Sequence, residues 1–270
     1  MIGSTVTYLF MLELGVGSLL CLWVLRHYDL TRSLRRILAG LGGAMVVVGL
    51  PFGMRALSVS AAGSRLLEAH VFWPLAVVAG TIIYIVSLPE GSSRRCAWVL
   101  AGTVVAGMGS VTAGALAIGA GSGLWDNVQR SGYFLSAMLL LGSTFGAMIL
   151  GHWYLVDRKM AIHPLRVAVC FLIVAILLRI AAVSVPTIHF IREALLTQPE
   201  TAPPLDLTLF WAQRALFGLV GPLVLGLMVW QTVRLRATQA ATGLLYIVLI
   251  FVIIGEILSH YLYLKTERFL

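Results

Sequence analysis

Residues 239–264 read QAATGLLYIVLIFVIIGEILSHYLYL, and this stretch decides the class of fold. It is longer than the roughly 20 apolar residues that a helix needs to cross the hydrocarbon core of a bilayer. Its apolar residues are continuous and do not alternate with polar ones, as they would in a strand of a membrane β-barrel. We therefore predict a membrane-spanning helix that carries an acid, Glu256, and a histidine, His260.

The whole chain shares this apolar character. Of its 270 residues, 60% are hydrophobic and 11% are charged, whereas soluble domains carry about 45–50% apolar and roughly 25% charged residues. A soluble enzyme, a disordered chain and a fibrous repeat are therefore excluded. The three cysteines, at positions 21, 96 and 170, are isolated, so we expect no disulfide framework, zinc site or covalently attached haem.

The apolar windows predict an all-α bundle of eight spanning helices, in a single integral membrane domain that covers residues 1–270. The expected ranges are about 5–25, 37–58, 67–88, 97–120, 132–156, 166–187, 207–233 and 239–264. The connections are short and leave no room for a soluble module. The longest, at about 188–206, contains three prolines and is expected to be irregular or a re-entrant surface segment.

Lysine and arginine are distributed unevenly between the two sets of connections. Eleven lie in those after the first, third, fifth and seventh helices, and five lie on the opposite side. Under the positive-inside rule the richer set is cytoplasmic. We therefore predict that both termini are non-cytoplasmic. The membrane is expected to be the cytoplasmic (inner) membrane of a prokaryote, which the chain crosses several times. The net charge of +8 then reflects topology, and we expect no nucleic-acid partner.

Ionisable residues inside the expected spans gather in the outer half of the bilayer, the half nearer the two termini. The deepest are Glu13, Arg179, Arg214 and Glu256. A charge near the centre of a spanning helix costs about 2.5–3.5 kcal/mol on insertion scales, and it usually faces a partner or a wet cavity. The two acids and two bases therefore predict either structural ion pairs or a binding cavity in this half.

The histidines and acids of this half form a set suited to moving protons. Imidazole titrates near neutrality, and a neighbouring carboxylate can relay its proton. A quinol headgroup needs such a proton acceptor, so we expect menaquinone or ubiquinone as the cofactor. The arginines would polarise a quinone oxygen or hold the acids in place. The residues assigned to quinone binding and proton transfer are Glu13, Glu68, His70, Arg179, Arg214, Glu256 and His260.

Other residues receive structural or secondary roles. These are Arg55, His152 at the inner end of the fifth helix, and Trp211, one turn from Arg214. Small residues let helices pack closely, so Gly142-x-x-x-Gly146 predicts a helix crossing. The pair at positions 221 and 222, Gly-Pro, predicts a kink in the seventh helix.

The segment IGEILSHYLYL (residues 254–264) resembles the last helix of the membrane subunits of DMSO reductase and polysulfide reductase, the NrfD-like group. Those helices tend to end in a Gly-Glu-x-x-x-Arg-x-x-x-Tyr pattern. Gly255, Glu256 and either Tyr261 or Tyr263 fit it, but His260 stands near where the family usually has arginine. The resemblance implies a subunit that docks an iron–sulfur protein, and with it a catalytic subunit, on the outer face and exchanges electrons with menaquinone.

Two other functions remain open from the sequence. In the first, the chain carries haem b between two histidines at similar depth, and His70 with His260 meets that condition. In the second, it is a transporter or a structural assembly subunit, although transporters often show inverted repeats and a site near the midplane. Whether the chain itself oxidises quinol or is a non-catalytic subunit also stays open.

Overall fold

The computed structural model describes residues 2–59, 65–88, 94–118, 123–157, 160–196 and 205–266. These residues are helical almost throughout, with no β-strand among them, which confirms the all-α class. The helices are α1 (Ile2–Val24), a short 3₁₀ turn (Leu25–His27), α2 (Arg32–Val59), α3 (Arg65–Ser87), α4 (Arg94–Ile118), α5 (Leu124–Val156), α6 (His163–Leu196), α7 (Leu205–Ala215), a π-helical turn (Leu216–Val220), α8 (Gly221–Arg234) and α9 (Thr238–Thr266).

Within the described residues, seven helical segments are long and apolar enough to cross a membrane. They lie in α1, α2, α4, α5, α6, the continuous unit from α7 to α8, and α9. The described apolar part of α3, Phe72–Ser87, is shorter than a full span. The fold is therefore that of a membrane helix bundle, while the eighth span and the side on which the termini lie stay predictions.

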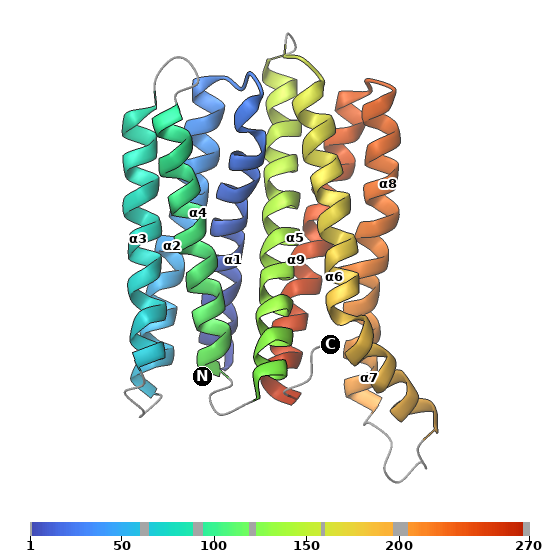
Figure 1. The fold of residues 1–270 in the computed structure, drawn as a ribbon. Helices are drawn as coiled ribbons and strands as arrows, with labels where there is room; N and C mark the ends of the chain where they lie inside the picture. The colour runs from blue at the N-terminus through green and yellow to red at the C-terminus, as the bar shows by residue number, and fades with distance from the viewer. Residues whose placement is uncertain are drawn as a thin grey trace.

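The bundle is built around α1 and α5, which pack against each other (Figure 1). Helix α1 also contacts α2, α4 and α9, and α5 also contacts α4, α6 and α9. The start of α1 and the end of α9 lie at the same end of the bundle (Figure 1), which we call the terminal end. The outer half of the sequence analysis is the half nearer this end.

The crossing of α1 and α5 depends on glycine. A Cβ atom built on Gly142 would overlap the backbone of Gly17 on α1, and one built on Gly146 would overlap the side chain of Cys21. The absence of side chains on both sides lets the two backbones touch. This confirms the close packing predicted for the Gly142-x-x-x-Gly146 pattern.

Two helical regions, the end of α6 and the join between α7 and α8, differ from the regular spans expected from the sequence. Helix α6 passes through Pro186 and runs to Leu196, so the expectation that irregular structure begins at about residue 188 is wrong. A π-helical turn, Leu216–Val220, directly precedes Gly221 and Pro222 in the continuous unit from α7 to α8, and the kink at these two residues stays a prediction. Isolated π turns change the direction in which the preceding side chains point and are frequent at functional sites.

Candidate functional site

Glu13 of α1 and His260 of α9 form an ion pair inside the bundle. Nε2 of His260 lies 3.0 Å from Oε2 of Glu13, and both side chains are fully buried. Nδ1 of His260 lies 2.7 Å from the backbone carbonyl oxygen of Glu256, one turn earlier on α9. Since a carbonyl can only accept, Nδ1 carries a proton, and Nε2 is the nitrogen that faces Glu13. The contact has the distance of an ion pair but not the geometry of a hydrogen bond, because both oxygens of Glu13 and Nε2 of His260 have no hydrogen-bond partner.

A second buried pair joins α6 to α9. Nε and Nη2 of Arg179 donate to the two carboxylate oxygens of Glu256 at 3.0 and 2.6 Å, the bidentate geometry that suits a guanidinium. The remaining donors of Arg179 bond to α5, where Nη1 reaches the carbonyl oxygen of Tyr133 at 2.6 Å and the hydroxyl of Ser136 at 3.2 Å. Each nitrogen of Arg179 therefore has a partner, and this arginine fastens α6 to α5 and α9.

Ser259 is the hub that joins this pair to its neighbours. Its Oγ accepts from Nη2 of Arg179 at 3.1 Å and from Nε of Arg214 at 3.3 Å. It also lies 2.5 Å from the hydroxyl of Tyr133. A serine hydroxyl has two acceptor sites and one proton. The hydroxyls of Ser259 and Tyr133 share one hydrogen bond, in which either oxygen can donate.

Arg214, in the last turn of α7, is the exception among these groups. Its side chain is 1% exposed, and its Nε bonds to Ser259. Nη1 and Nη2 are buried and have no hydrogen-bond partner. A buried polar group normally has a partner, so two unpaired donors on one cation need an explanation.

A line of polar side chains leads from these groups toward the terminal end. Arg130 of α5 donates through Nε to the hydroxyl of Tyr263 at 2.8 Å and through Nη1 to Oδ1 of Asn127 at 3.3 Å. The ring of Tyr263 lies 5.5 Å from that of Tyr133, between centroids. Asn127 is half-buried, so polar groups extend from the interior to the surface at this end.

The structure thus brings together five of the seven predicted site residues, from α1, α6, α7 and α9, with Tyr133 of α5 and Ser259 of α9. We call this group the buried polar cluster, and its members are Glu13, Tyr133, Arg179, Arg214, Glu256, Ser259 and His260. The side chains of Glu68 and His70 lie outside the described residues, so their assignment stays a prediction.

The residues given secondary roles lie outside the cluster. Arg55 is exposed near the end of α2. His152 is exposed in the half of α5 remote from the terminal end, where its Nδ1 lies 3.0 Å from the hydroxyl of Tyr246. Trp211 is half-buried on α7, with its ring 5.7 Å from that of Phe190. None of these contacts joins them to the cluster.

Sequence reasoning missed the two hydroxyls of the cluster, Tyr133 and Ser259. Ser259 follows Glu256 by three residues, so helical periodicity places both on one face of α9. That spacing was a usable signal. Tyr133 carried no such signal, since its place against Arg179 depends on how α5 packs on α6.

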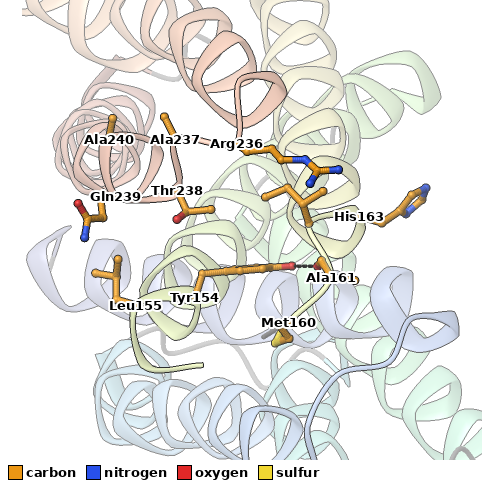
Figure 2. A pocket seen from close by; sticks show the side chains of 11 residues that line it. Tyr154, Leu155, Met160, Ala161, His163, Arg236, Ala237, Thr238, Gln239 and Ala240 are labelled. Carbon is orange, nitrogen blue, oxygen red and sulfur yellow. Dashed lines mark hydrogen bonds between the residues drawn. The ribbon is translucent and has the colours of Figure 1, made fainter. Parts of the chain in front are cut away.

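Two cavities lie elsewhere. One of about 820 Å³ is at the end opposite the terminal end, between the α5–α6 connection and the start of α9. Figure 2 shows the Tyr154 hydroxyl bonded to the carbonyl oxygen of Ala161 at its edge. The other, of about 550 Å³, is lined by residues of α1, α7 and α9 that include Ile254, Ile257 and Tyr261. By helical periodicity Ile254 lies on the side of α9 opposite Glu256, and no cluster residue lines either cavity.

Within the described residues, no group of three or more His, Cys, Asp or Glu side chains is arranged to hold a metal ion. No family model, curated protein or solved structure matches the chain. The chemistry of the buried polar cluster therefore has to carry the functional argument. That cluster offers an acid that faces a histidine, a bidentate ion pair and a cation with two unpartnered donors, all buried in the bundle.

Proposed function

We propose that the chain is the quinone-reactive membrane subunit of a respiratory oxidoreductase, in the cytoplasmic membrane of a prokaryote. The observation that carries the proposal is the fully buried pair of Glu13 and His260, 3.0 Å apart. Ionisable groups inside a membrane bundle are costly and usually mark a site of proton or ligand chemistry. A quinone, either menaquinone or ubiquinone, is the lipid-soluble redox compound whose reaction needs such a pair.

The pair suits the proton steps of quinol oxidation. As a quinol becomes a quinone, two protons and two electrons leave it. Each O–H bond breaks with its two electrons left on the oxygen. Glu13 and His260 accept the released protons one at a time. Oε2 of Glu13 and Nε2 of His260 are only 3.0 Å apart, so a proton that one group receives can pass to the other. The reduction of a quinone uses the same groups in reverse.

The electrons need an acceptor or donor that a partner protein holds. We propose an iron–sulfur subunit docked at the terminal end, with the catalytic subunit beyond it. The position of the buried polar cluster in the half nearer that end supports this assignment. The polar groups from Tyr133 to Asn127 reach the same end and would connect the site with water.

The contacts of His260 favour this function over haem transport. Both of its ring nitrogens already face protein atoms, Nε2 an acid and Nδ1 a backbone carbonyl. A haem ligand needs one ring nitrogen directed at the iron. The involvement of His70 in haem binding stays a prediction, and a reduced-minus-oxidised absorption spectrum of the purified complex tests it.

The decisive experiment is quinol oxidation by the purified complex carrying Glu13→Gln or His260→Gln. General acid–base groups contribute roughly 10²–10⁴-fold to a rate, so we expect each variant to lose at least two orders of magnitude in kcat. His152→Gln is the matched control, because His152 is remote from the cluster and exposed. Full turnover in both cluster variants, with the complex intact, contradicts the proposal.

A further inference from the structure

Arg214 differs from the other ionised groups of the cluster in having no counter-ion. Arg179 is paired with Glu256 through two hydrogen bonds. Glu13 faces His260 at 3.0 Å. Among the described contacts, no carboxylate pairs with Arg214. Arg214 is therefore the arginine of the cluster whose charge meets no carboxylate in those contacts.

An isolated charge in a low-dielectric interior is unfavourable unless something neutralises it. The free donors of Arg214 show where that partner would bind. Nη1 and Nη2 are buried without a partner, while Nε is fixed by Ser259. Two parallel N–H groups on a planar guanidinium match one anionic oxygen or a pair of adjacent oxygens. The vacant donors are thus suited to an oxyanion.

We propose that Arg214 is the binding residue for the anionic form of a hydroxylated ring, the quinolate that remains when a quinol gives up its first proton. The inference rests on the proposed function and assigns the charge state of the ligand at that site. Arg214 compensates the negative oxygen, and Arg179, whose donors are all occupied, does not contact the ligand. The two arginines, which look alike in sequence, therefore have different roles.

Arg214 lies beside an irregular turn of its helix. It is in the last turn of α7, directly before the π-helical turn Leu216–Val220 through which the helix runs on into α8. Gly255 of α9 packs directly against Gly218 of that turn, so this turn and α9 approach each other closely next to Arg214.

The test compares two ring compounds that differ in charge. The purified full chain in detergent is titrated with 2-hydroxy-1,4-naphthoquinone, an anion at neutral pH, and with neutral 2-methyl-1,4-naphthoquinone, following the visible band of the first and the tryptophan fluorescence of the protein. We expect the wild type to bind the anion roughly tenfold or more tightly than the neutral ring, the effect of a single charge-assisted contact. Arg214→Gln should lose this preference and keep the neutral affinity, and Arg214→Lys should keep part of it.

Arg234→Gln is the control, because Arg234 is exposed at the opposite end of the bundle. A second measurement is the melting temperature without ligand, which Arg214→Gln should leave unchanged or raise, since it removes an uncompensated charge. Equal affinity of the wild type for both compounds, or an unchanged preference in Arg214→Gln, overturns the inference alone. If neither compound binds the wild type, the proposed function falls and the inference falls with it.

Discussion

The ion pair of Arg179 and Glu256 makes a sharp prediction about stability. Glu256 receives two hydrogen bonds from Arg179, and both side chains are fully buried. Glu256→Leu removes the carboxylate and leaves two buried guanidinium groups, those of Arg179 and Arg214, against Ser259. Breaking a buried pair in this way costs about 3–5 kcal/mol, because an uncompensated charge stays behind.

The second variant of this test removes both charges. Arg179→Met with Glu256→Leu takes away both members of the pair and replaces them with apolar groups of similar length. Such replacements of a whole buried pair are often neutral or stabilising, although Met cannot bond to the carbonyl of Tyr133 as Arg179 does. We expect the double variant to be more stable than Glu256→Leu alone. Arg179→Met alone should cost less than Glu256→Leu, because the free donors of Arg214 can turn toward Glu256.

The assay is thermal unfolding of the purified chain in detergent, followed by the helical circular dichroism signal. For a chain of this size about 1 kcal/mol shifts the melting temperature by roughly 2–4 °C, so Glu256→Leu should melt roughly 6–20 °C lower than the wild type. A double-mutant cycle then gives a coupling energy of about 2 kcal/mol or more. If the loss in free energy of unfolding of the double variant equals the sum of the losses of the two single variants, the two residues are not coupled. That result would refute the prediction.

Two further predictions concern packing and the hub of the cluster. Gly142→Ala should destabilise the bundle by about 1–3 kcal/mol or more, because its Cβ meets the backbone of Gly17. Gly102→Ala is the control, since a Cβ at Gly102 would meet nothing within 4 Å. This variant should stabilise α4 by roughly 0.5–1 kcal/mol. Equal melting temperatures for the two variants would contradict the crossing. Ser259→Ala should cost about 1–3 kcal/mol, because it leaves Nε of Arg214 without a partner. Ser184→Ala, which removes a hydroxyl bonded only within its own exposed turn, should stay within about 0.5 kcal/mol of the wild type.

Much of this arrangement could be predicted from sequence because charge is scarce in the chain. When 11% of residues are charged, an acid or arginine inside an apolar run is conspicuous, and the membrane cost of an isolated charge forces such residues toward one another. That reasoning brought Glu13, Arg179 and Glu256 to one place before their partners were known. It could not assign the pairs, since which acid meets which base depends on the rotation and packing of α1, α6 and α9.

The division of roles between Arg179 and Arg214 was equally out of reach of the sequence. Both are single arginines in apolar helices, and only their contacts separate them. Arg179 faces α5 and α9, where a carboxylate, two hydroxyls and a carbonyl use all of its donors. Arg214 lies at the end of α7, directly before the π turn. Its Nε contacts Ser259, while Nη1 and Nη2 have no hydrogen-bond partner.

A structural role explains Arg179 fully and Arg214 only in part. If Arg214 served stability alone, an apolar side chain there would avoid the cost of burying an unpaired cation and would pack as well. Nor does it need to neutralise Glu256, which Arg179 already does through both carboxylate oxygens. What distinguishes Arg214 is a buried positive charge with two donors that have no hydrogen-bond partner. Such a charge has its use when a ligand gives up a proton and is left with a negative oxygen.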